Sequence, residues 1–231
     1  MLKNKLSYLS LLLLICSGIF YFSPRAFCRD DWQFNNNYSF EYALSEKVDL
    51  GLLIEGRLNN DAGNFYYYHF QPGITCHISD FFDLGLGYRY IKKEKAKEGK
   101  DIWDDEHRLL IDPVVNWQLS EFKFSNQFRF EYRYFDLDKD CWRYRNKLKV
   151  KKNLKLGEFE FSPYISDEIF YDFNTDEFCQ NRLEVGFERK IAKQIKASLF
   201  YRIQSERAGR DWDEVNVIGL KFKIDLGGKK S

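Results

Sequence analysis

The sequence predicts an all-β protein: a single up-and-down antiparallel transmembrane β-barrel of about 12 strands, with about 10 as the alternative, preceded by a signal peptide. Three observations support this fold class. The first residues have the composition of an export signal. The rest of the chain alternates apolar and polar residues with a period of two, and tight connections alternate along it with longer polar ones.

The N-terminal segment has the order of a secretory signal. Lys3 and Lys5 precede a mostly apolar run, and cleavage after Cys28 would place small residues at the two positions that need them. We therefore expect a signal peptide over 1–28 and a barrel over 29–231. An uncleaved membrane anchor is the alternative, and it is disfavoured because the apolar run is short for a spanning helix.

The segment from Phe122 to Tyr134 shows the strand pattern most clearly. Its phenylalanines and tyrosines fall on one face, whereas lysine, serine, glutamine, arginine and glutamate fall on the other. Eleven segments of this kind follow one another from Trp32 to Ile224. Because single-chain bacterial barrels have even strand numbers, we expect a further strand, made by a turn at Asn35–Asn37 that divides the first segment.

Connections of two lengths separate these segments. Outer-membrane barrels combine short periplasmic turns with longer external loops in this way. The tight connections occur at Ser45–Lys47, Ser79–Asp80, Ser120–Glu121, Leu156–Gly157 and Ala192–Lys193, and the longer ones at Asn59–Asn64, Lys92–Asp105, Asp136–Asp140, Asp172–Glu177 and Ser205–Asp211.

Three prolines lie inside the predicted strands: Pro72, Pro113 and Pro163. Proline cannot donate a hydrogen bond to the strand ladder, and a closed barrel has no edge strand to hold it. We therefore expect a bulge at each of the three prolines.

A soluble β-sandwich or lipocalin-like barrel would show the same alternation with the apolar face turned inward. The transmembrane interpretation is favoured by the export signal, by tyrosine and tryptophan near the segment ends, and by a final alternating strand close to the C-terminus. We therefore expect the protein in the cell outer membrane, in contact with outer-membrane lipids and lipopolysaccharide.

Several strings in the chain resemble those of a known family. They are NFYYYHFQPGI, LGLGYRY followed by WDDEHRLLIDP, FRFEYRYFDLDKDCWRYRNKLKV, SPYISDEIFYDF, and QNRLEVGFERKI followed by LFYRIQS. Their succession, from Asp31 to Leu226, is similar to that of the family catalogued as domain of unknown function 2490, which is regarded as made of outer-membrane β-barrels. The resemblance implies this fold and location, and it brings no activity and no catalytic residue.

The polar face of the strands would line the lumen of such a barrel, and it carries both signs of charge. In a narrow barrel, arginine–carboxylate pairs would fill the interior and stiffen the wall, because an unpaired buried charge is strongly unfavourable. Alternatively, the basic excess between Arg143 and Lys151 would give a small pore for anionic solutes. The lumen residues singled out are Arg57, Arg89, Arg108, Arg129, Glu131, Arg133, Arg143, Arg145, Lys147, Glu168, Arg182 and Arg202.

Enzyme activity, a metal site and a cofactor are not expected. An outer-membrane hydrolase would need a histidine beside a nucleophile, and the spacing around His69, His77 and His107 places none. His107 does follow acidic residues at the end of the longest loop, so an Asp–His arrangement is the least favoured alternative. The acidic groups around Asp104 and Asp213 would suit Ca²⁺, but a solvated acidic rim is the preferred explanation.

The function predicted from these features is that of an outer-membrane barrel of unassigned activity, either structural or narrow and porin-like, with adhesion through its loops as the alternative. The formal charge of +1 gives no electrostatic reason to expect nucleic acid as a partner. The cysteines that follow the signal are odd in number and cannot complete a disulfide framework. A bridge between Cys141 and Cys179 is left open.

Overall fold

The computed structural model describes residues 32–97, 100–136, 139–209 and 211–228, so the predicted signal peptide lies outside the described residues. None of these residues belongs to a helix long and apolar enough to cross a membrane. They form twelve strands: β1 (Trp32–Ala43), β2 (Val48–Asn59), β3 (Asn64–Ser79), β4 (Phe82–Lys97), β5 (Lys100–Leu119), β6 (Phe122–Phe135), β7 (Cys141–Lys152), β8 (Leu154–Leu156), β9 (Phe159–Asp172), β10 (Glu177–Ala192), β11 (Ile195–Ala208) and β12 (Asp211–Gly228).

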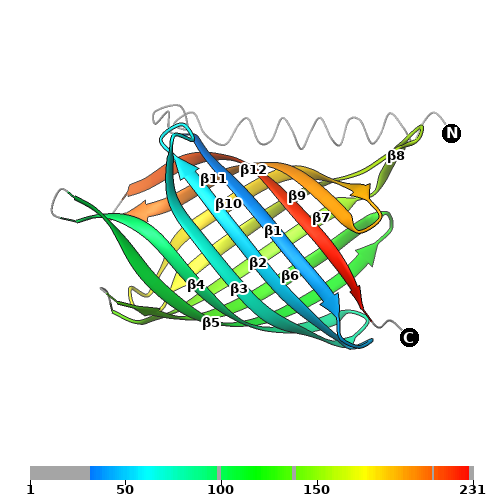
Figure 1. Cartoon of the computed structure of the whole chain (residues 1–231), viewed down its shortest axis with the longest axis horizontal. Helices are drawn as coiled ribbons and strands as arrows, with labels where there is room; N and C mark the ends of the chain where they lie inside the picture. Colours follow the sequence, from blue (N-terminus) through cyan, green and yellow to red (C-terminus); the bar gives the residue numbers. More distant parts are fainter. Residues whose placement is uncertain (1–31, 98–99, 137–138, 210, 229–231) are drawn as a thin grey trace. The chain divides into compact units, whose positions relative to one another are not determined.

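Eleven of the described strands form a closed wall (Figure 1). Neighbouring strands pair antiparallel from β1 to β7, from β7 directly to β9, and from β9 to β12. The wall closes between β12 and β1, which run parallel, with Phe34 opposite Ile218 and Phe40 opposite Ile224. The parallel closure follows from the odd number, because alternating directions leave the first and last strands pointing the same way.

The predicted transmembrane barrel of about twelve strands is confirmed, but the twelfth strand lies elsewhere than expected. It is β8, a three-residue strand that pairs with β9 in the connection after β7. The Asn35–Asn37 run forms no turn, and β1 passes straight through it. Asn35 and Asn37 are buried inside the barrel, while the Asn36 amide donates to the Tyr38 hydroxyl at 2.9 Å.

The connections define two ends of the barrel. The end with the connections 44–47, 80–81, 120–121, 153–158 and 193–194 is called the turn end, and the opposite one the loop end. The two longest predicted connections at the loop end, Lys92–Asp105 and Ser205–Asp211, are shorter in the structure because strands continue into them. β4 and β5 pair as far as Lys97 and Lys100 and project past their neighbours as a hairpin, at the left in Figure 1. The predicted Lys92–Asp105 loop is therefore mostly hairpin.

Side chains alternate between the outside and the inside of the wall. On β5, Leu109 is 60% exposed, whereas the adjacent Leu110 is 2% exposed and shares its inner face with the buried Arg108. Over the described strands, many large aliphatic and aromatic side chains are exposed, and the buried set contains arginines, glutamates and a histidine. A soluble barrel would show the reverse arrangement. The outer surface is therefore the one that suits lipid.

The predicted bulges at the three prolines are wrong. Pro72, Pro113 and Pro163 each stay in register with the strand on one side. On the other side the pairing is interrupted: the β3–β4 pairs skip 71–72, the β5–β6 pairs skip 112–113, and the β7–β9 pairs end one residue after Pro163. A proline lacks only its own N–H donor, so the strand loses hydrogen bonds to one of its two neighbours. A gap in the pairing on that side is sufficient, and no extra residue needs to be inserted as a bulge.

Candidate functional site

The register of the wall brings charged side chains from neighbouring strands to one height inside the barrel. Glu131 on β6 lies opposite Arg143 on β7, Arg129 lies opposite Arg145, and Glu184 on β10 lies opposite Arg202 on β11. Each of these residues occupies an inward position of its strand, and apart from Asn146 beside Arg145 their chain neighbours are aliphatic or aromatic. The alternation read from the sequence therefore places them in the lumen, and the register decides which charges meet.

Glu131 is the centre of the largest cluster, and its exposed fraction is 0%. Its Oε2 accepts from Nε of Arg143 at 2.9 Å and from Nη1 of Arg108 at 3.4 Å, while its Oε1 accepts from Nη1 of Arg145 at 2.7 Å. Arg129 approaches Oε1 to 4.0 Å. One buried carboxylate is thus surrounded by four guanidinium groups, which strongly favours its ionised form.

Three further carboxylates extend this cluster along the wall. Glu106 accepts from Nε of both Arg108 and Arg133 at 2.6 Å. Asp112 receives Arg129 in a two-bond fork of 2.5 and 2.8 Å. Glu168 accepts from Nη2 of Arg145 at 2.5 Å, with Arg182 at 3.9 Å. Six arginines therefore face four carboxylates across β5, β6, β7, β9 and β10, an excess of two positive charges; this set is called the arginine network below.

A second cluster surrounds Glu184 on the β9–β12 side of the lumen. Arg202 donates to its Oε2 through Nε at 3.0 Å and Nη2 at 2.6 Å, and the Tyr164 hydroxyl donates to Oε1 at 2.9 Å. Lys221 on β12 also pairs with Glu184. Lys147 lies within electrostatic reach of both Glu184 and Glu168, so it links the two clusters.

The opposite side of the lumen is held by smaller contacts. Arg57 pairs with Glu55 on the same strand and stacks over the ring of Tyr67, 4.1 Å from its centroid. The Tyr67 hydroxyl is 3.0 Å from Nδ1 of the buried His69. The buried Arg89 donates from Nε to the amide oxygen of Gln71 at 2.8 Å. All twelve lumen residues singled out from the sequence thus lie on the inner face.

Apolar side chains complete the filling of the lumen. Phe170 and Phe200 are buried on the inner face, together with Ile91, Leu110 and Val217 from other strands. Arg143, Arg145 and Arg182 stack over Phe170, with their guanidinium carbons 5.3, 4.6 and 4.7 Å from the ring centroid. Because these buried groups come from strands all round the wall, the lumen is packed with side chains at mid-height.

The inward aromatic residues are the part of the site that sequence reasoning missed. Phe170 follows Ser166 and Glu168 at a spacing of two, so it occupies the polar face of its segment. Phe200 follows Ser198 and precedes Arg202 in the same way. An aromatic residue on a polar face was the available signal. Its role in the lumen depends on the arginines that stack on it from other strands, and the sequence does not show which these are.

The three histidines lie in three separate places. His69 is buried in the lumen, and His77 at the turn end lies between Asp49 at 3.1 Å and Asp83 at 2.7 Å. His107 packs on the outside, with Nδ1 2.5 Å from the Tyr88 hydroxyl. Of the acids before His107, Asp104 points inward to Lys95 at 2.5 Å, whereas Asp105 lies on the outer face with His107.

The loop-end acids and thiols have local partners. Glu106 belongs to the arginine network, and Asp105 accepts from the Tyr90 hydroxyl at 2.6 Å. These two acids therefore point to different faces of β5 instead of converging on one cation. Cys141 and Cys179 are free thiols, and the sulfur of Cys141 is 3.7 Å from a carboxylate oxygen of Asp172.

Three solved structures are similar to the chain at low identity. The β domain of the Bordetella autotransporter BrkA is 12% identical, with 76% of this chain and 82% of that chain covered and a TM-score of 0.49. OmpT of Vibrio cholerae, expressed in the outer membrane, is 8% identical, with 69% and 54% covered and a TM-score of 0.38. The anion-selective porin from Comamonas acidovorans is 10% identical, with 78% and 82% covered and a TM-score of 0.34.

No curated protein matches the chain. The model of the family described as "Protein of unknown function (DUF2490)" matches residues 32–215, from the first residue of β1 into β12. The match thus spans nearly the whole wall and includes the arginine network and, except for Lys221, the Glu184 cluster. The chain belongs to the DUF2490 family of proteins of unknown function, as its sequence strings suggest.

Proposed function

We propose that this protein is an outer-membrane β-barrel whose lumen is closed at mid-height, so that it serves as a structural barrel and not as an open diffusion pore. The observation that carries this proposal is the burial of Glu131, Arg143, Arg145 and Glu168 in the middle of the lumen, where an open pore would leave charged side chains in water. Charged side chains that are paired with one another and shielded from water would close the lumen as a rigid plug.

The outer surface of the barrel supports the proposed location in the outer membrane. Its exposed aliphatic and aromatic side chains suit contact with outer-membrane lipids, and the loop end would meet lipopolysaccharide. By analogy with the usual arrangement of short periplasmic turns, the turn end faces the periplasm. The exterior at mid-height is largely apolar, and its exposed Asp167 accepts a hydrogen bond from the Asn181 amide at 2.8 Å.

A narrow anion-preferring pore is the second candidate. It is favoured by the excess of two positive charges in the arginine network, because arginine in a constriction attracts anions. The two candidates differ in one measurable property: the closed barrel passes no ions, whereas the narrow pore gives small current steps that grow with an anion gradient.

Planar-bilayer recording of the refolded protein separates the two candidates. We expect no stepwise current from the wild type. We expect current steps from Arg145→Ala/Glu168→Ala, which removes both partners of one ion pair from mid-lumen and so leaves the net charge of the lumen unchanged. Lys155→Ala/Glu160→Ala removes an equally balanced but exposed pair at the turn end and should stay silent.

Two results would contradict the proposal. Regular steps from the wild type would show an open lumen and favour the narrow pore. Silence from both the wild type and the Arg145→Ala/Glu168→Ala variant, with each shown to be inserted, would place the barrier somewhere other than the arginine network.

A further inference from the structure

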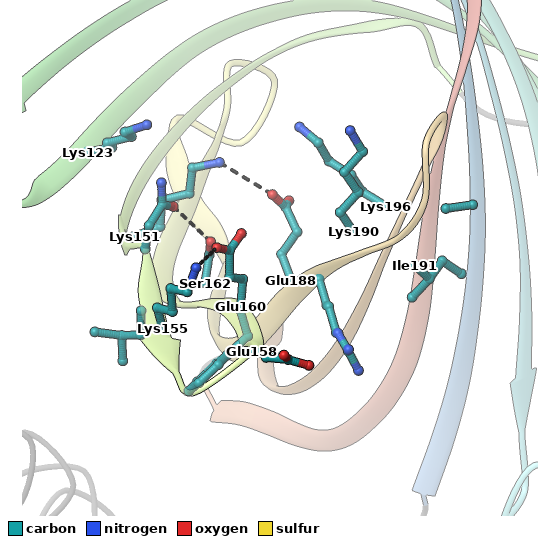
Figure 2. Close-up of a pocket in the computed structure, with 15 residues that line it drawn as sticks. Lys123, Lys151, Lys155, Glu158, Glu160, Ser162, Glu188, Lys190, Ile191 and Lys196 are labelled. Atoms are coloured by element: carbon teal, nitrogen blue, oxygen red, sulfur yellow. Dashed lines mark hydrogen bonds and ion pairs between the residues drawn. The ribbon is translucent and has the colours of Figure 1, made fainter.

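The turn end of the barrel opens into a cavity of about 820 Å³ beneath the β8–β9 hairpin. A second hollow of about 560 Å³ adjoins it and shares Lys123 and Lys151 as lining residues. Figure 2 shows Lys123 and Lys151 on one side of the larger cavity, Lys190 and Lys196 on the other, and Glu188 between them. The cavity therefore lies between two groups of lysines.

These lysines face one another directly across paired strands. Lys123 on β6 is opposite Lys151 on β7, and Lys190 on β10 is opposite Lys196 on β11. The second row continues to Lys223 on β12, which is opposite Lys196 and pairs with Glu41 at 2.7 Å. Like charges directly opposite each other in a sheet repel and destabilise the pairing. Two such rows at the same end of one barrel are therefore unfavourable unless a negative charge lies between them.

The protein supplies only part of that negative charge. Glu188 accepts from Nζ of Lys151 at 3.5 Å, and Glu160 accepts from Lys155 on the hairpin at 3.0 Å. Among the described residues lining the larger cavity there are five lysines and three glutamates, and Arg189 stacks over the ring of Phe159 at 4.0 Å. The lining thus carries an excess of positive charge in a hollow open to water.

The lysines of the cavity differ from the arginines of the arginine network in how their charges are paired. There, every arginine lies within 4.0 Å of a carboxylate and is buried or nearly so. At the turn end, Lys149 instead rests on the ring of Tyr164, 3.9 Å from its centroid, and lines the second hollow beside Lys123. Each arginine of the network thus has a carboxylate partner within the wall, whereas the lysine cavity leaves donors directed at a space large enough for a solute.

We propose that this cavity binds a small polyvalent anion, a solute that carries two or more phosphate groups. Lysine ammonium groups bind phosphate as point charges, with three donors each and no demand for a planar partner. A phosphate chain placed between Lys123–Lys151 and Lys190–Lys196 would neutralise both repelling pairs at once. Binding requires no passage through the lumen, so the site is independent of whether the barrel is closed.

Isothermal titration of the refolded protein in detergent with sodium tripolyphosphate tests this site. We expect saturable binding by the wild type that weakens as salt is added. Lys123→Gln/Lys196→Gln removes one lysine from each row and should lower the affinity by about tenfold or more, since each loses charge-assisted hydrogen bonds. Glu188→Gln removes a competing carboxylate from the cavity and should raise the affinity by several-fold.

Lys193→Gln is the matched control, because Lys193 lies in an exposed turn at the same end and does not line the cavity. It should bind like the wild type. The proposal is overturned if the folded wild type shows no saturable binding, or if Lys193→Gln weakens binding as much as Lys123→Gln/Lys196→Gln, which would show attraction to net charge alone. Folding of each variant is checked by circular dichroism before titration. The titration does not measure conductance. A negative titration would therefore overturn the anion-binding site without affecting the closed-lumen proposal.

Discussion

Glu131→Gln is expected to lower the free energy of unfolding by about 3–5 kcal/mol, the usual effect of removing one partner from a buried ion pair. The substitution keeps the shape of the side chain but removes the charge that Arg108, Arg143 and Arg145 share. Three guanidinium groups would then repel one another in a packed interior. Reversible unfolding by urea in lipid vesicles, followed by tryptophan fluorescence, measures the change.

The control for Glu131→Gln is Glu160→Gln, since Glu160 also pairs with a cation but is exposed at the turn end. An exposed pair contributes at most about 1 kcal/mol, so this variant should unfold almost like the wild type. Adding Arg143→Gln to Glu131→Gln should recover part of the lost stability, because it removes one of the stranded charges. Equal and small effects of Glu131→Gln and Glu160→Gln would contradict the central role of the network.

Ile111→Arg is expected to destabilise the inserted barrel by about 2–4 kcal/mol, the effect of an arginine facing lipid near the bilayer midplane. Ile111 is 44% exposed on the outer face of β5, between Leu86 and Phe130 on the neighbouring strands. Leu119, which is 68% exposed, ends the same strand at the turn end. Because Leu119→Arg would lie near the interface, it should cost only about 0–1 kcal/mol.

The same unfolding assay in vesicles compares the two arginine variants. The order of the two losses in stability is the informative result, because Leu119 is the more exposed residue and yet Leu119→Arg is expected to be the milder change. If both variants unfold like the wild type, the outer face of β5 meets water, and the transmembrane arrangement is wrong. If Leu119→Arg is the more damaging, the membrane does not centre on the middle of the strand.

The faces of the strands could be predicted from the sequence because side-chain alternation is local. A period of two is enough to place Arg108 inside and Leu109 outside without knowledge of any partner strand. The strand number and the closure could not be predicted, because they depend on long-range pairing. Nothing near β1 shows that it will pair in parallel with β12, and nothing near β8 shows that β7 will bypass it to pair with β9.

The basic strand β7 illustrates the same limit at the site. Read from the sequence, one face of this strand is a continuous positive row made of Arg143, Arg145, Lys147, Lys149 and Lys151. In the barrel the row is divided, because the neighbouring strands supply Glu131 and Glu168 to the arginines and Lys147, whereas Lys151 pairs with Glu188. The sequence therefore reveals the charges, whereas the register decides which half is neutralised and which half is left for a ligand.

The outward position of the aromatic residues is the claim on which the whole account depends. All five tryptophans, Trp32, Trp103, Trp117, Trp142 and Trp212, are among the exposed large side chains, and the last four occur on β5, β7 and β12. Tryptophan fluorescence of the protein refolded into vesicles of brominated lipid reports directly on contact with acyl chains. We predict strong quenching by the brominated lipid, greatest when the bromine lies close to the headgroup, because tryptophan gathers at membrane interfaces. Emission that is unaffected by bromine at any depth, together with efficient quenching by an aqueous quencher, would contradict the account.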